Sequence, residues 1–131
     1  MLLDTSGLMC LFDMRDFRHA EARLFYDAAG KRITHSYVLA EFVALAHARG
    51  APREGALSFV AALQDDLAVE VVWTDETLHR AAVSLLQSRP DKAWSLCDAV
   101  SILLMQQRGM TDALTTDHHF EQAGLRRLLP Q

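Results

Sequence analysis

The chain has 131 residues, of which 50% are hydrophobic and 23% are charged. This composition excludes a disordered chain, and no apolar run approaches the roughly 20 residues that a bilayer span needs. Thirteen lysines and arginines against seventeen aspartates and glutamates give a net charge of −4, which is unusual for a protein that binds nucleic acid through net charge alone. We expect residues 1–131 to form a single domain without a membrane segment.

The first residues and the two cysteines indicate the cellular compartment of the protein. Met1-Leu2-Leu3-Asp4 lacks the basic and apolar regions of a signal peptide, so we expect none. Cys10 and Cys97 have apolar neighbours and form no Cys-x-x-Cys pair. Both are therefore expected to be buried free thiols, and the protein is expected to be cytoplasmic.

Short β-like runs alternate with longer helical runs along the chain. The expected strands are residues 1–4, 33–35, 67–73, 113–116 and 125–129. The expected helices are residues 5–12, 16–29, 36–50, 52–64, 74–89, 95–109 and 118–123.

Several chain features mark the boundaries of these elements. Ser36 and Thr74 are predicted N-caps, and Gly124 is predicted to close the last helix. Strands separated by ten or more helical residues pair in parallel through crossovers. The sequence therefore predicts an α/β fold with helices on both faces of the sheet.

Four acidic residues stand out against this background. Asp4 and Asp117 directly follow expected strands, at the carboxyl edge where parallel sheets bind ligands. Glu41 and Asp98 lie in otherwise apolar helical runs, with no Lys or Arg three or four residues away. An ionised carboxylate in such a run is costly unless it is paired or hydrogen-bonded.

Each acid also has an ordinary structural interpretation. Asp4 and Asp117 both precede helical segments, where turn or N-cap chemistry is common. Glu41 fits a strip of helix that faces solvent, and Ser95-x-x-Asp98 has the spacing of a capping arrangement. These interpretations stay open for each residue taken singly.

The four acids carry more weight as a group. Two unit charges about 4 Å apart interact by roughly 4 kcal/mol at an effective dielectric constant near 20. Acids gathered at one sheet edge therefore need raised pKa values or a counter-ion. Because oxygen ligands without Cys or His suit a hard dication, we expect Mg²⁺ or Mn²⁺ there.

The stretches that contain these acids resemble the motifs of the PIN-domain ribonuclease family, in particular the toxins of VapBC-type toxin–antitoxin pairs. They are Leu3-Asp4-Thr5-Ser6, Ala40-Glu41, the run from Ser95 to Ser101, and the run from Leu114 to Phe120. The resemblance implies a three-layer α/β/α sandwich with a short, mostly parallel sheet of four to five strands. It also implies Mg²⁺- or Mn²⁺-dependent cleavage of RNA, a homodimer, and a small antitoxin protein that blocks the pocket.

The resemblance also implies roles for individual residues. Asp4 and Asp98 match the main metal ligands, Asp117 completes the metal site, and Glu41 is the remaining catalytic acid. The hydroxyls expected to support them belong to Thr5, Ser6, Ser95 and Thr116.

Other chemistry-bearing residues receive weaker interpretations. His118 and His119 are adjacent on an expected helix, where side chains point about 100° apart, so packing or substrate contact is favoured over joint metal binding. Trp73, Trp94, the methionines and most of the apolar run from Leu8 to Tyr26 are expected in the core, as is Phe120. The basic residues that can rim the pocket, or else cover an ordinary surface, are Lys31, Arg32, Arg49, Arg53, Arg89 and Lys92.

Three alternative functions remain open. A PIN-like nuclease of RNA processing would lack the short overlapping antitoxin gene that a toxin should have beside it. A non-catalytic module that binds RNA or protein would form no Mg²⁺-dependent product. A phosphatase or phospho-acceptor domain would need an Asp-x-Asp pair, which Asp4-Thr5-Ser6 does not provide.

Overall fold

A computed structural model describes residues 1–130, in which strands and helices alternate as the sequence predicts. The strands are β1 (Leu2–Leu3), β2 (Arg32–His35), β3 (Val69–Val72), β4 (Asp112–Leu114) and β5 (Arg126–Arg127). The helices are α1 (Thr5–Phe12), α2 (His19–Ala28), α3 (Ser36–Ala48), α4 (Arg53–Asp65), α5 (Glu76–Ser88), α6 (Leu96–Arg108) and α7 (His119–Gln122).

The five strands form one sheet in which each pairing is parallel, in the order β3-β2-β1-β4-β5. The chain first builds outward from β1 to β3 and then adds β4 and β5 on the other side of β1. The strand order therefore reverses between β1 and β4, which is where sheets of this kind bind ligands, beyond the carboxyl ends of their strands. The expected short, mostly parallel sheet of four to five strands is confirmed.

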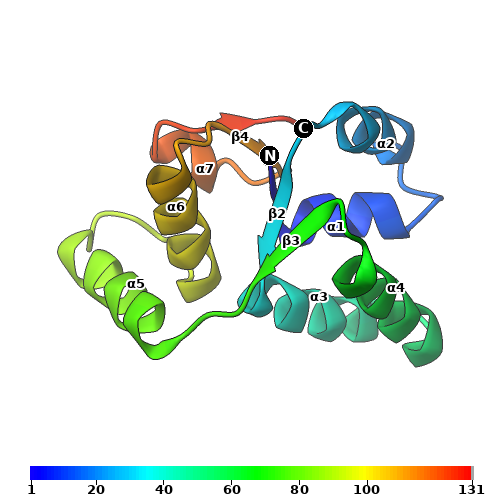
Figure 1. The fold of residues 1–131 in the computed structure, drawn as a ribbon, viewed down its shortest axis with the longest axis horizontal. Helices are drawn as coiled ribbons and strands as arrows, with labels where there is room; N and C mark the ends of the chain where they lie inside the picture. The colour runs from blue at the N-terminus through cyan, green and yellow to red at the C-terminus, as the bar shows by residue number, and fades with distance from the viewer. Residues whose placement is uncertain (131) are drawn as a thin grey trace.

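Helices cover both faces of the sheet (Figure 1). Helices α1 to α4 lie on one side of β2 and β3, and α5 to α7 lie on the other. Successive strand residues point to opposite faces. Accordingly, Leu3 packs with the helices of the first layer, whereas Leu2 packs with Met105 of α6 and Phe120 of α7. The predicted three-layer α/β/α architecture is thus confirmed.

Two predicted helix caps are wrong. Ser36 does not cap α3, because His35 Nδ1 accepts the Val38 N–H at 3.4 Å and Ser36 Oγ instead accepts the N–H of Thr74. The cap of α5 is Asp75 rather than Thr74, since the Asp75 carboxylate accepts the Leu78 N–H at 2.8 Å. In both cases the side chain with the better reach to the third residue of the helix takes the cap.

The start of α2 also differs from its prediction. The Asp13 carboxylate accepts the N–H of Arg15, and the Asp16 carboxylate accepts the N–H of Arg18. These local bonds hold turns where the hydrophobic pattern predicts helix. Helix α2 consequently begins at His19, three residues later than expected.

Some residues assigned to the core are on the surface. The exposed fractions are 64% for Trp73, 80% for Met14, 83% for Phe17 and 72% for Leu24. The predicted core positions are confirmed for Trp94, Phe120 and residues 8–11, which are buried. The two cysteines are buried and free, as expected. Among the helices of residues 1–130, none has the length and hydropathy needed to cross a membrane.

Helix α1 approaches β4 so closely that only glycine fits at position 7. A Cβ on Gly7 would lie 2.0 Å from the carbonyl oxygen of Leu114. We expect Gly7→Ala to lower the free energy of unfolding by roughly 1–3 kcal/mol or more, because α1 has to move away from the sheet. Urea denaturation measures this change.

The matched control is Gly55→Ala in α4. A Cβ there would meet only Phe12, at 3.9 Å, and alanine favours a helix over glycine by about 0.5–1 kcal/mol. This variant should gain stability. Gly7→Ala with wild-type stability would refute the close approach of α1 to β4.

Candidate active site

Asp4 leaves β1 at the carboxyl edge of the sheet and immediately precedes α1. It is only 4% exposed, and its Oδ2 accepts hydrogen bonds from Thr115 Oγ1 at 2.7 Å and Ser6 Oγ at 3.3 Å. Burial raises the pKa of Asp4 to about 7; the Thr115 hydrogen bond opposes this rise, and the charges of Asp98 and Glu41 add to it. The Asp4 carboxylate therefore needs a proton or a cation near neutral pH.

A network of hydroxyls joins α1 to the loop after β4. Ser6 Oγ and Thr115 Oγ1 lie 3.0 Å apart, and each accepts a backbone N–H from the loop: Thr116 donates to Ser6 and Asp117 donates to Thr115. This network holds Asp117 beside the part of α1 that follows Asp4. Thr115 has no place among the sequence-predicted site residues, although its position two residues before Asp117 is typical of a turn hydroxyl.

Asp98 occupies the first turn of α6 and serves two purposes. Its Oδ2 accepts the Ser95 N–H at 3.0 Å, while Ser95 Oγ accepts the Asp98 N–H at 3.0 Å, which completes a capping box. The same Oδ2 lies 2.9 Å from His119 Nδ1. The ordinary interpretation of Asp98 is therefore correct, and it coexists with a position in the acidic cluster.

His119 connects Asp98 to Asp117. Its Nδ1 lies 2.9 Å from Asp98 Oδ2 and 3.4 Å from Asp117 Oδ2, and its backbone N–H donates to Asp117 Oδ1 at 2.9 Å. The expectation that His118 and His119 diverge is wrong, since their ring centroids are 4.8 Å apart. His118 precedes the first residue of the short helix α7, so both rings can turn toward Asp117.

Glu41 comes to the cluster from α3 and is exposed, as its ordinary interpretation predicts. Its charge nevertheless raises the pKa of Asp4. The same acids affect Cys97. Burial raises the pKa of its thiol, and the charges of Glu41, Asp4 and Asp98 raise it further. Three acids from three separate segments therefore lie close to one buried thiol.

The sequence-predicted hydroxyls occupy different positions relative to these acids. Ser6 contacts Asp4 and Ser95 contacts Asp98 through hydrogen bonds. Thr116 takes part through its backbone N–H. The buried Thr5 lies near Cys97, whose pKa its hydroxyl lowers.

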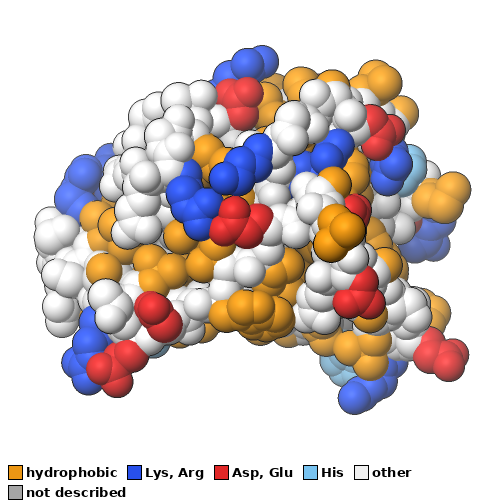
Figure 2. Space-filling view, viewed as in Figure 1, with side chains coloured by type: hydrophobic (Ala, Val, Ile, Leu, Met, Phe, Trp, Pro, Cys, Tyr) orange, Lys and Arg blue, Asp and Glu red, His pale blue; other side chains and the backbone are white. Residues whose placement is uncertain are grey.

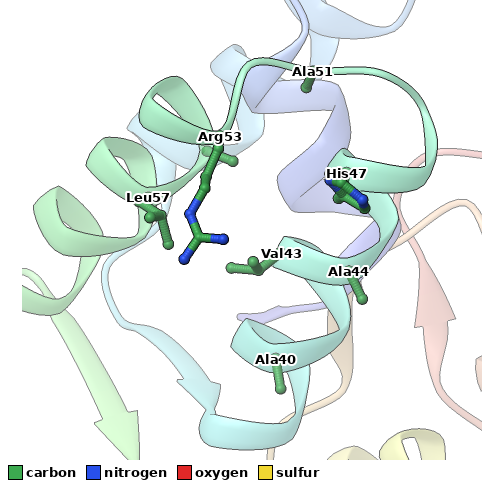
Figure 3. Close-up of a pocket in the computed structure, with 8 residues that line it drawn as sticks. Ala40, Val43, Ala44, His47, Ala51, Arg53 and Leu57 are labelled. Atoms are coloured by element: carbon green, nitrogen blue, oxygen red, sulfur yellow. The ribbon is translucent and has the colours of Figure 1, made fainter.

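A hollow of about 340 Å³ lies between α3 and α4 (Figure 3). Its wall includes Ala40 and Ala44, which flank Glu41 along α3, and Arg53 extends from α4 toward Val43. Arg53 is thus a basic side chain at the rim of this hollow.

The other predicted rim cations are placed less favourably. Arg32 begins β2 and Lys31 precedes it, so both lie at the edge of the sheet opposite the acids. Arg89 and Lys92 pair with Asp91. On the face shown in Figure 2, basic and acidic side chains are interspersed rather than gathered by sign.

The donor set of the cluster fits a hard divalent cation. In residues 1–130, none of the acids Asp4, Glu41, Asp98 and Asp117 forms an ion pair with a lysine or arginine. Protein donors occupy Oδ2 of Asp4 and of Asp98, which leaves their Oδ1 atoms for a ligand. Carboxylate oxygens of this kind suit Mg²⁺ or Mn²⁺.

Divalent cations are expected to stabilise the protein more at pH 8 than at pH 6. The pKa of Asp4 is about 7 in the folded protein and 3.8 as its ordinary value, so without a cation the free energy of unfolding falls as pH rises from about 4 through 7. A cation on the ionised carboxylate offsets this loss. Thermal melts with Mg²⁺ and with EDTA at both pH values measure the effect.

Asp4→Asn provides the control, because it removes the carboxylate and keeps its shape. In EDTA at pH 8 we expect it to be more stable than the wild type, by up to on the order of 4 kcal/mol, and to respond less to Mg²⁺. A Mg²⁺ response in the wild type that is equal at both pH values would contradict this account.

Comparison with known proteins relates this site to a family. The sequence matches the PIN domain family model over residues 1–125. The 23S rRNA-specific endonuclease VapC20 of Mycobacterium tuberculosis is 28% identical over 132 residues, which cover 100% of this chain and 99% of that protein. The crystal structure of Mycobacterium tuberculosis VapC20, described as a sarcin-ricin loop cleaving toxin, matches with a TM-score of 0.86 and 25% identity over 95% of each chain.

Proposed function

Because this chain belongs to the PIN domain family, which is a family of nucleases, we propose that it is the ribonuclease toxin of a VapBC-type toxin–antitoxin pair. The reaction is the hydrolysis of RNA phosphodiester bonds with the help of Mg²⁺ or Mn²⁺. The observation that carries this proposal is the convergence of Asp4, Glu41, Asp98 and Asp117 where the strand order reverses.

The proposed roles follow from the contacts of each acid. Asp4 and Asp98 would hold the cation, and Asp117 would complete the site. Glu41, the exposed member, orients the attacking water. When bound, the cation lowers the pKa of that water and stabilises charge on the phosphoryl oxygens.

Hydrogen bonds within the chain hold the acids in fixed positions for this reaction. Thr115 and Ser6 hold Asp4, while the Ser95 N–H and the His119 ring hold Asp98. These donors therefore orient the carboxylates before a cation or substrate arrives. The expected products carry a 5′-phosphate and a 3′-hydroxyl.

Ribosomal RNA is the first substrate to test, because the related VapC20 is a 23S rRNA-specific endonuclease. The net charge of −4, and the interspersed charges on the face shown in Figure 2, offer RNA little general attraction. Recognition would then depend on the shape of the RNA and on local contacts, with Arg53 at the rim of the hollow between α3 and α4 as one candidate.

An antitoxin protein and a second copy of the chain are the proposed partners, in the cytoplasm. Met14, Phe17 and Leu24 are exposed apolar side chains that an antitoxin can cover. A nuclease of RNA processing would have no such partner, and a short overlapping gene beside this one would favour the toxin.

Asp98→Asn and Asp4→Asn are each expected to reduce RNA cleavage by roughly 100-fold or more, because each removes a charge at the proposed metal site. The measurement is mapping of RNA 5′ ends after incubation of the purified protein with ribosomes and with naked 23S rRNA in Mg²⁺. Asp65→Asn, which alters an exposed acid at the end of α4, should leave cleavage unchanged.

Two outcomes of this assay would overturn the proposal. One is wild-type cleavage by Asp98→Asn with contaminating nuclease excluded. The other is cleavage by the wild type that persists in EDTA, because hydrolysis would then not need the cation. Binding of RNA without any product would favour a non-catalytic module.

A further inference from the structure

Three consecutive residues bring a second kind of ligand set to the rim of the acidic cluster. Asp117, His118 and His119 each offer one ligand atom, and these three atoms all lie within 4.8 Å of one another. The set combines one carboxylate with two imidazoles, whereas Asp4, Glu41 and Asp98 offer oxygen alone. The two groups of residues therefore favour different metals.

The separations within this set fit a small tetrahedral ion. Ligand atoms about 2.1 Å from a tetrahedral centre lie roughly 3.4 Å apart. Asp117 Oδ2 is 3.4 Å from His119 Nδ1, and Asp117 Oδ1 is 3.6 Å from His118 Nδ1. These two distances end on different oxygens of Asp117, so an ion bound through one oxygen requires the three groups to draw together, and the His118 side chain is 65% exposed.

Imidazole nitrogen is a good ligand for Zn²⁺ and a poor one for Mg²⁺, which prefers oxygen and retains its waters. We propose that Asp117, His118 and His119 form a binding site for a transition-metal dication of the zinc type. This site shares Asp117 with the proposed Mg²⁺ site but takes no ligand from Asp4, Glu41 or Asp98. Three protein ligands leave one tetrahedral position for water.

Zinc at this site would act on the neighbouring acids. His119 Nδ1 lies 2.9 Å from Asp98 Oδ2, so a zinc ion on that nitrogen takes the imidazole away from Asp98. The same ion occupies Asp117. Zinc occupancy therefore opposes Mg²⁺-dependent cleavage, and this consequence, unlike zinc binding itself, rests on the proposed function.

The binding test uses the full chain without a polyhistidine tag, in buffer free of Mg²⁺. Titration of Zn²⁺ against a chromophoric chelator should show one bound ion in the wild type and affinity at least about tenfold lower in His118→Ala. His47→Ala removes an exposed histidine in the hollow between α3 and α4 and should bind as the wild type does. Asp4→Asn should also bind normally.

Nuclear magnetic resonance of the imidazole groups locates the ion directly. Of the six histidines in the chain, only His118 and His119 should change their signals when one equivalent of Zn²⁺ is added. Wild-type affinity in His118→Ala would overturn the proposal, and so would loss of binding in Asp4→Asn, which would place zinc among the oxygen ligands.

Cleavage assays separate this proposal from the proposed function. Zn²⁺ added to a fixed Mg²⁺ concentration should inhibit the wild type at lower concentrations than it inhibits His118→Ala. A protein that binds Zn²⁺ as described yet cleaves no RNA would refute the nuclease proposal and leave the zinc site standing. Equal zinc inhibition of both proteins would refute the coupling between the site and the acids.

Discussion

The free-energy cost of burying Asp4 dominates the carboxyl edge of this sheet. A buried carboxylate loses the hydration that stabilises its charge, and two further acids add repulsion. The Thr115 hydroxyl recovers part of that cost but leaves the pKa near 7. The fold thus keeps an unfavourable concentration of negative charge that a dication can neutralise, as a metal-dependent active site requires.

The backbone makes this arrangement of charge possible through close packing beside Asp4. Gly7 lets α1 rest on the carbonyl of Leu114, and the next residue, Thr115, is then close enough to donate to Asp4. The hydroxyls of Ser6 and Thr115 join the two segments at the same point. Strand order, helix packing and the position of the first acid are consequently parts of one arrangement rather than independent features.

The sequence predicts the strand-end acids well because a parallel sheet brings the carboxyl ends of its strands to one edge, whatever the details of packing. Glu41 and Asp98 are predictable because charge is conspicuous in an apolar helix. The partners of Thr115 and His119 depend on side-chain rotamers set by residues about 20 to 110 positions away. Short-range patterns carry no such information, and for the same reason they place the exposed Trp73 in the core.

The capping box at Ser95 and Asp98 has an evolutionary consequence. Replacing Asp98 disturbs both the acidic cluster and the start of a thirteen-residue helix, whereas Glu41 is exposed on its helix. If the protein harms its own cell, spontaneous mutants that survive and still accumulate folded protein should carry substitutions at Glu41 more often than at Asp98. Lineages altered at Asp98 should more often be cleared by proteolysis.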